Sequence, residues 1–325
     1  MKKYIGTVIT AVIVITLSVL GFVFNGVHLS QNQLDTLLIL LIICGSSALY
    51  CFVVGEIARN NSQMDKLWSI LPIAYAWVIC EKDGFSLRTI IIAIIVTIWG
   101  VRLTINFARK GAYSIKFWEG EEDYRWSILR KKKFLNTRFG WGLFDLFFIS
   151  IYQNALVLAM TLPALMVMGS PANFGVFDAI AIITSLGCIT IELIADEQQW
   201  KFHETKKKLL KEGKQLSELP EPYNKGFNTT GLWGYSRHPN YFGEQGLWIC
   251  LYLFVIAAGA TTYYVFSWTM FGPLFIVLLF LGSSSFGEGI SNGKYPEYKY
   301  YLATVSKYIP FRKYNYEKAK AKLDK

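Results

Sequence analysis

Charged residues are scarce in this chain. Asp, Glu, Lys and Arg make up 17% of its 325 residues, against roughly a quarter in an average soluble domain. Hydrophobic residues make up 53%, and a soluble chain of this composition would leave large apolar patches facing water. The composition therefore excludes a soluble enzyme, a disordered chain and a fibrous protein.

Histidine and paired cysteine are scarce too. The chain has three histidines, His28, His203 and His238, and its five cysteines all lie in or beside apolar runs. No two cysteines form a C-x-x-C pair, so the sequence supports neither a zinc site nor a disulfide framework. The G-x-S-x-G and H-E-x-x-H motifs are also absent, which argues against nucleophilic and zinc-protease mechanisms.

The apolar residues gather in runs of about 20, the length that crosses a bilayer core. We therefore predict an all-α, polytopic transmembrane helix bundle with about eight spans. The first run has no small-residue cleavage site and is too long for a signal peptide, so it is expected to be a retained anchor. The expected spans are 4–25, 35–58, 66–81, 88–108, 142–168, 175–196, 240–260 and 263–284.

The basic residues segregate to one side of this arrangement. With the N-terminus inside, the outer loops near 26–34, 169–174 and 261–262 contain no Lys or Arg, whereas the inner segments 109–138 and 197–239 contain many. This pattern predicts that both termini are cytoplasmic. It also explains the net charge of +10 without nucleic acid, and the expected location is the cell membrane, in contact with membrane lipids.

The densest polar cluster lies at 231–244, where the seventh predicted span begins. Pro239 suits the first turn of a helix, which places Asn240 and Glu244 on one helical face. An interfacial anchor would explain Arg237 but not a carboxylate inside the hydrocarbon, where such groups are costly and usually functional. The cluster is therefore a candidate binding site.

A second polar cluster closes the sixth predicted span. Glu192 and Asp196 are four residues apart, and Gln199 and His203 continue the same stripe. The helix is expected to continue out of the membrane as far as Leu219. Such a face could hold ribose hydroxyls or an amide, although an ordinary solvated helix end is an equally good interpretation.

Further polar residues lie inside or beside the predicted spans. Gln153 and Asn154 either line a cavity or bridge helices. Gly243 allows another element to approach the seventh span closely. Glu288, in a glycine-rich stretch after the last span, is a further candidate contact for a polar ligand.

The motifs taken together resemble the steroid 5-alpha-reductase-like membrane family, most of all its bacterial branch, the domain-of-unknown-function 1295 group. The resemblance rests on Gly231-Leu-Trp-Gly-Tyr-Ser-Arg-His-Pro-Asn-Tyr-Phe-Gly-Glu244, on Ala195-Asp-Glu-Gln198 and on Glu122-Asp-Tyr-Arg-Trp126. It covers about residues 60–312 and implies a seven-helix core. The expected domains are an extra N-terminal helix at 1–30, a reductase-like membrane domain at 31–312 and a basic cytoplasmic tail at 313–325.

The resemblance implies an NADPH-dependent reductase that acts on a conjugated carbon–carbon double bond of a lipid or steroid-like substrate. Hydride goes to the beta carbon while a carboxyl and a tyrosine polarise the carbonyl. Asp65 stands about where the family places its catalytic acid, and no metal is implied. The implied cofactor contacts are Asp196, Asn240, Glu244 and Trp248, with His203, Tyr235 and Arg237 as nearby candidates.

The chain departs from the family pattern at two positions. Around Ile98, where a catalytic tyrosine is expected, stand only Ile, Val, Thr and Trp, and no histidine follows the last span. Two other functions stay open. The R-H-P-x-Y-x-G pattern is shared with isoprenylcysteine carboxyl methyltransferases, which use S-adenosylmethionine, although the Asp196 motif favours the reductase. The other open function is that of a non-enzymatic lipid-binding protein.

Overall fold

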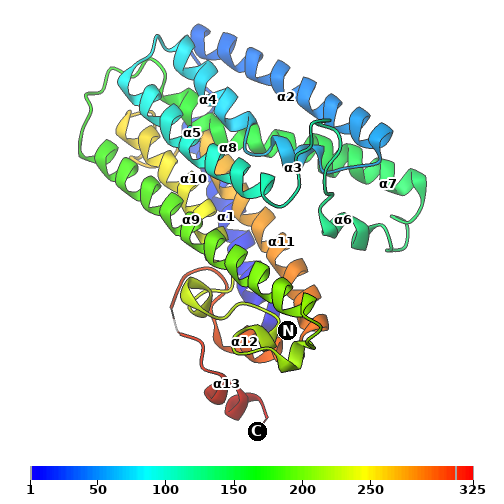
Figure 1. Ribbon diagram of the computed structural model, residues 1–325. Helices are drawn as coiled ribbons and strands as arrows, with labels where there is room; N and C mark the ends of the chain where they lie inside the picture. Colours follow the sequence, from blue (N-terminus) through cyan, green and yellow to red (C-terminus); the bar gives the residue numbers. More distant parts are fainter. Residues whose placement is uncertain (1, 312, 325) are drawn as a thin grey trace. The chain divides into compact units, whose positions relative to one another are not determined.

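The computed structural model describes residues 2–311 and 313–324. Helices make up 72% of the chain (Figure 1), and no strand occurs among the described residues, which confirms the all-α prediction. The chain divides into two compact units, Met1–Ile183 with Ile249–Ile276, and Thr184–Trp248 with Val277–Lys325. The division into 1–30, 31–312 and 313–325 stays a prediction, and residues 1, 312 and 325 lie outside the described residues.

Among the described residues, six helices are long and apolar enough to cross a membrane, which indicates a multi-pass membrane protein. Helix α4 (Leu71–Lys82) has 12 residues, about 18 Å at 1.5 Å per residue, and is not among the six. The predicted count of eight spans and the cytoplasmic termini therefore stay predictions. The six are Gly6–Asn25, Gln31–Ala58, Leu87–Ala108, Arg138–Val167, Val176–Lys211 and Trp268–Lys294.

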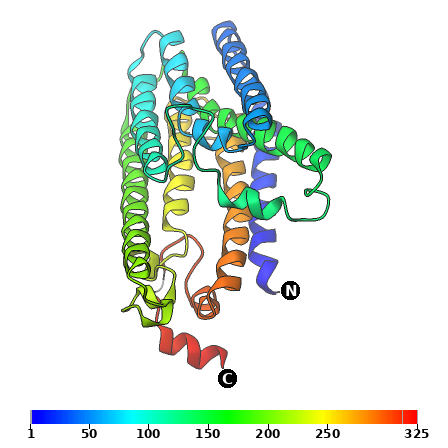
Figure 2. The same ribbon diagram turned by 45° about the vertical axis from the view of Figure 1, so that its right-hand side comes forward.

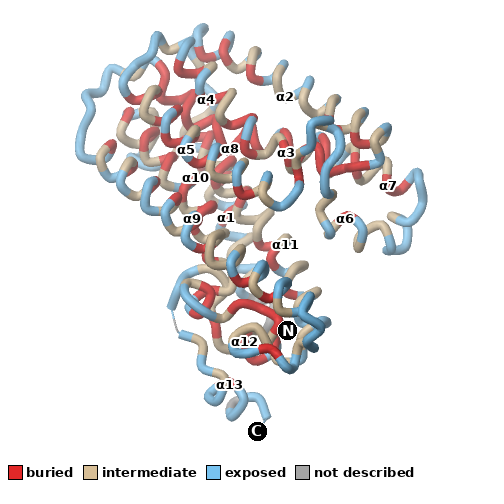
Figure 3. Tube along the Cα trace, viewed as in Figure 1, coloured by how far each residue is buried: buried red, intermediate tan, exposed pale blue. Residues whose placement is uncertain are grey.

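The first unit packs around α8 (Gln153–Val167). Every residue of this helix except Ala155 is buried, and it packs against α2, α4 and α5, so it forms the centre of the unit (Figure 3). Such all-round burial is what a helix without a polar face requires. The other elements are α1 (Lys2–Asn25), α2 (Gln31–Ala58), α3 (Gln63–Leu67), α5 (Leu87–Ala108), α6 (Tyr124–Leu129), α7 (Arg138–Phe144), η1 (Asp145–Tyr152) and η5 (Trp268–Met270).

The run Arg138–Val167 contains a π-helical segment, η1, between α7 and α8. A π-helical turn has a wider hydrogen-bonding pattern than an α-helix, and such turns are frequent at functional sites. It begins at Asp145, which is 0% exposed. The irregular segment therefore brings a carboxyl group into the interior of the first unit.

A buried ion pair fixes one loop of the first unit. Arg88 Nε lies 2.7 Å from Asp178 Oδ1, and Arg88 Nη2 donates to Asp178 Oδ2 at 2.9 Å. The guanidinium also donates to the carbonyl oxygens of Ala172 and Asn173. Arg88 is 6% exposed and Asp178 1%, so the fork holds the start of α5 and the loop before α9 together.

The second unit is built on parts of three long helices, α9 (Val176–Lys211), α10 (Pro239–Ala257) and α11 (Phe271–Lys294). Helix α9 ends at Lys211, so the prediction that it reaches Leu219 is wrong. Gly213 follows at φ +86, a left-handed conformation that commonly ends helices. The remaining elements are η2 (Leu216–Glu218), η3 (Tyr223–Lys225), η4 (Gly231–Gly234), α12 (Tyr298–Thr304) and α13 (Tyr316–Leu323).

Candidate functional site

The motif at 231–244 lies in the second unit and is anchored on α9. Gly231 has φ +58, and a Cβ there would lie 2.4 Å from the side-chain oxygen of Gln198, so glycine is required. Gln198 Oε1 accepts a hydrogen bond from the Leu232 amide at 2.8 Å. The Trp233 indole donates to a carbonyl oxygen of the same α9 turn at 2.9 Å. These contacts fix the loop against the turn that carries the predicted acidic residues.

The start of α10 is anchored on the C-terminal part of the chain. The Arg237 amide donates to the Ser306 carbonyl oxygen at 3.0 Å, and the His238 amide donates to the Lys307 carbonyl oxygen at 3.0 Å. Helix α10 then begins at Pro239, as the sequence predicts, because proline lacks the N–H that a first helical turn leaves unbonded. The motif is thus bonded to α9 through its loop and to the C-terminal segment through the start of α10.

Glu288 of α11 lies at the centre of an ion-pair cluster at this motif. Its Oε1 accepts from Arg237 Nε at 2.7 Å and lies 3.0 Å from His238 Nε2, and Lys307 Nζ lies 3.9 Å from its Oε2. Arg237 Nη1 also donates to two backbone carbonyl oxygens. Burial lowers the pKa of the His238 imidazole below its ordinary value of 6.5, although Glu288 acts in the opposite direction. Arg237, a predicted cofactor contact, is therefore engaged in a local ion-pair cluster.

Helices α9 and α10 approach each other closely at Gly243. A Cβ there would lie 2.5 Å from Glu192 Cγ and 2.7 Å from the Cys188 carbonyl oxygen. One turn further, a Cβ on Gly246 would lie 2.7 Å from Cys188 Sγ. The predicted close approach at Gly243 is confirmed, and its partner is the acidic stripe of α9.

Polar side chains meet where these two helices face each other. Asn240 Nδ2 donates to Asp196 Oδ1 at 3.2 Å, and Trp248 Nε1 donates to Glu244 Oε1 at 3.2 Å. Glu244 is 6% exposed and Trp248 1%. Asn240 Oδ1 is buried and accepts no hydrogen bond from any described residue. We call Glu192, Asp196, Asn240 and Glu244 the acceptor cluster, because its oxygens suit a ligand rich in N–H or O–H donors.

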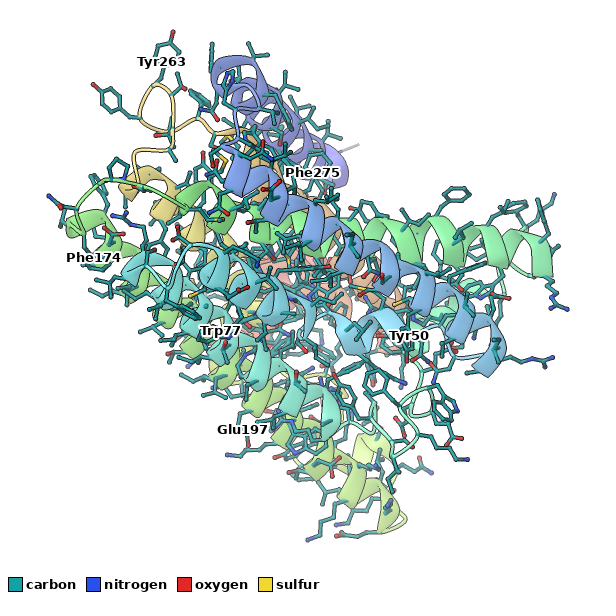
Figure 4. All side chains as sticks on the ribbon, turned by 90° about the horizontal axis from the view of Figure 1, so that it is seen from above. Tyr50, Trp77, Phe174, Glu197, Tyr263 and Phe275 are labelled. Atoms are coloured by element: carbon teal, nitrogen blue, oxygen red, sulfur yellow. The ribbon has the colours of Figure 1, made fainter. Side chains whose placement is uncertain are left out.

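The other predicted contacts lie at the surface of the second unit. His203 is exposed, and its Nε2 lies 3.1 Å from the side-chain nitrogen of Gln199, one turn back on α9. Tyr235 is 41% exposed. Glu197, the neighbour of Asp196 that Figure 4 labels, has a side chain 41% exposed. In this part of α9, Asp196 contacts α10 through its hydrogen bond from Asn240.

The sequence interpretation missed what the C-terminal region does. Glu288 was expected at most to touch a ligand, and it instead anchors the cations of the motif. Tyr301, 2% exposed, donates to the Trp233 carbonyl oxygen at 2.5 Å. The tyrosine-rich tail was the available signal, but no local pattern indicates which loop its side chains contact.

Asp65, the predicted catalytic acid, lies in α3 of the first unit. Trp126 Nε1 donates to Asp65 Oδ2 at 3.2 Å and to Ser62 Oγ at 3.1 Å, and Arg125 Nη2 lies 4.0 Å from Asp65 Oδ1. Burial raises the pKa of the Asp65 carboxyl above its ordinary value of 3.8, although Arg125 opposes it. The Glu122–Trp126 motif thus supplies the groups that surround this carboxyl.

A second network joins the loop after α5 to the start of η1. Arg130 Nη1 bonds Glu122 Oε2 at 2.6 Å, and its Nη2 donates to Asn61 Oδ1 at 2.5 Å. The guanidinium lies 4.3 Å from the Trp141 ring centroid. Asn61 Nδ2 in turn donates to Asp145 Oδ2 at 2.7 Å. The loop is therefore fixed by charge-assisted hydrogen bonds.

A row of buried polar side chains continues from Asp145 into the helices. Ser150 Oγ donates to Asp145 Oδ1 at 3.4 Å, and Asn154 Nδ2 donates to the Ser150 carbonyl oxygen at 2.7 Å. Asn154 Nδ2 also lies 3.8 Å from Cys51 Sγ, so it bridges α8 and α2, but its Oδ1 accepts nothing from any described residue. Tyr75, 0% exposed, lies near the Cys51 thiol. We call these five residues the polar row.

Comparisons with known proteins give a family and one relative. The family described as "Protein of unknown function (DUF1295)" matches residues 51–305. The chain is similar to an uncharacterized protein of Schizosaccharomyces pombe, with 33% identity over 282 residues that cover 81% of this chain and 78% of that protein. No solved structure matches.

Proposed function

We propose that this chain, which belongs to the DUF1295 family, is an oxidoreductase of the cell membrane that uses NADPH to reduce a conjugated carbon–carbon double bond in a lipid or steroid-like substrate. The family description names no function, so the proposal rests on the site and on the motif resemblance. Bound NADPH would supply the hydride. The residues of this chain would hold it, orient the substrate and supply a proton.

The observation that carries the proposal is the acceptor cluster. Asn240 Oδ1 is buried with no donor among the described residues, and a buried acceptor left unsatisfied costs about 1–3 kcal/mol. Beside it lie the Asp196 and Glu244 carboxyl groups. Ribose hydroxyls and a nicotinamide NH₂ are the donors that such a cluster would bind.

Two features keep the acceptor cluster in shape. Trp248 Nε1 donates to Glu244, which orients this carboxyl group. Gly243 lets α10 lie against Glu192, which brings the two helices close together beside the cluster. A carboxylate held this way strengthens hydrogen bonds to a neutral donor, since charge-assisted bonds are about twice as strong as neutral ones.

Asp65 is proposed as the proton donor. A carboxyl whose pKa is raised by burial holds its proton at higher pH than an exposed one. In that state it donates a hydrogen bond to a substrate carbonyl oxygen, which favours attack at the beta carbon. Trp126 fixes the carboxyl at 3.2 Å through Oδ2.

The polar row is a candidate contact for the oxygen of the substrate. It lies among η1, α2, α4 and α8, and Asn154 carries a buried acceptor that no described residue bonds. Tyr75 is a buried phenol of α4. It is therefore a candidate for the tyrosine that the family pattern places near Ile98, where this chain has none.

Ligand protection in lipid nanodiscs tests the proposal. NADPH is expected to raise the unfolding temperature of the protein, and Asp196→Asn or Asn240→Leu should weaken its binding at least tenfold, or 1.4 kcal/mol. The matched control is Glu197→Gln, the neighbouring residue on the exposed side of α9. Equal losses in the Asp196 and Glu197 variants would place the nucleotide elsewhere.

One observation favours a second function, an S-adenosylmethionine-dependent methyltransferase. Arg237 donates to Glu288 and to backbone carbonyl oxygens. Fewer of its N–H groups are therefore available to bind the phosphate of NADPH. The acceptor cluster also suits the amino group and ribose of S-adenosylmethionine. Protection by S-adenosylmethionine but not NADPH would replace the reductase with this function. Protection by neither nucleotide would favour a non-enzymatic lipid-binding protein.

A further inference from the structure

Residues 130–139, the turn after α6 together with the first two residues of α7, carry an unusual concentration of positive charge. They include Arg130, three consecutive lysines at 131–133 and Arg138, and no Asp or Glu occurs from Tyr124 to Phe144. Arg130 pairs with Glu122. The three lysines and Arg138 are exposed. Figure 2 shows this turn at the edge of the first unit.

Two aromatic side chains stand exposed in the same turn. Phe134 is 55% exposed and Phe139 72%. Phe134 has φ +76, a conformation that is rare and strained for a bulky residue. Because its side chain is exposed, Phe134 does not pack in the core of the protein. It is therefore positioned to contact a surface outside the chain.

The turn is rigid rather than loose. Thr137 Oγ1 donates to the Phe134 carbonyl oxygen at 2.8 Å and accepts from the Gly140 amide at 3.0 Å, which caps α7. A Cβ on Gly140 would lie 2.1 Å from the Phe134 carbonyl oxygen, so glycine is required there. The Asn136 amide closes the turn on the Lys132 carbonyl oxygen at 3.0 Å. The exposed phenylalanine is therefore presented and fixed by specific contacts.

We propose that this basic turn, residues 130–139, docks on anionic phospholipid head groups, with Phe134 and Phe139 inserted between them. It leads into Arg138–Val167, one of the helices that can cross a membrane, and includes the first two residues of that helix. Clusters of basic residues beside a spanning helix bind anionic lipids, and aromatic side chains add apolar contact at that depth. The inference is independent of the cofactor proposal, since it involves none of the acceptor-cluster residues.

The test uses the full chain in nanodiscs of phosphatidylcholine alone or with phosphatidylglycerol. The variant replaces Lys131, Lys132 and Lys133 by glutamine, and native mass spectrometry measures the retention of phosphatidylglycerol. We expect at least tenfold weaker retention in the variant, and a similar weakening of the wild type in high salt, which shortens the screening length to a few ångströms. The matched control replaces Lys207, Lys208 and Lys211 of α9, three exposed lysines without neighbouring strained aromatics, and should keep wild-type retention.

Hydrogen exchange distinguishes insertion from simple charge attraction. Amides of 130–139 should be more protected in phosphatidylglycerol discs than in phosphatidylcholine discs, and Phe134→Ser with Phe139→Ser should remove that protection. Equal loss of lipid in both lysine variants would overturn the proposal, because total charge alone would then explain it. Protection that appears in detergent and grows with protein concentration would also overturn it, by assigning the turn to a second copy of the chain.

Discussion

Glu288→Gln tests the ion-pair cluster that anchors the start of α10. The side chains of Glu288, Arg237 and His238 are 11%, 12% and 14% exposed, so solvent screens them little. Breaking a buried ion pair costs about 3–5 kcal/mol, because the remaining charge stays buried. Arg237 keeps its two backbone carbonyl acceptors, so we expect the lower end of that range. The amide keeps the shape of the carboxyl group, which isolates the charge.

Unfolding in mixed micelles measures this cost through the fluorescence of the ten tryptophans. A loss of about 3 kcal/mol should lower the midpoint temperature by roughly 6 °C or more. The double variant Arg237→Met with Glu288→Gln removes both charges. Its destabilisation should fall below the sum of the single variants by about 1–3 kcal/mol, the coupling typical of contacting groups.

Additive losses in the double variant would refute the ion-pair reasoning. In that case Arg237 and Glu288 would stabilise the unit through separate contacts. A Glu288→Gln variant as stable as the wild type would refute it more directly. The control is Glu197→Gln, whose partner Lys201 is exposed and which should cost well under 1 kcal/mol.

Three further predictions follow from buried groups. Asp178→Asn should destabilise the first unit by about 3 kcal/mol or more, because it leaves Arg88 buried without its carboxylate; an unchanged midpoint would contradict this. Gly243→Ala should cost about 1–3 kcal/mol, since its Cβ would lie 2.5 Å from a side chain of α9, whereas Gly187→Ala meets nothing within 4 Å and should be tolerated. The pKa of His238 is lowered from 6.5 by burial, so the unfolded chain binds the proton first and stability should fall as pH drops below about 6.5. His238→Gln should flatten that part of the stability profile, and an unchanged slope would show that another group titrates.

Several features of the candidate site depend only on neighbouring residues in the chain, so the sequence determines them. Helical periodicity alone places Asn240 and Glu244 on one face, and the proline before them begins α10. The glycine at 243 signals a close helix contact, which the structure finds against Glu192. Membrane-spanning helices are equally local, because about 20 apolar residues suffice to cross a bilayer whatever they pack against.

The tertiary structure alone decides which charged groups are paired. Arg237 is a candidate cofactor contact in the sequence, yet it bonds Glu288, 51 residues away. Burial raises the pKa of Asp65, whereas the hydrogen bond from Trp126, 61 residues away, acts to lower it. No periodicity encodes such pairings, because Coulombic and desolvation energies depend on the final distance and burial. The sequence therefore determines which residues line each helix face, and packing decides which of them are left to bind a ligand.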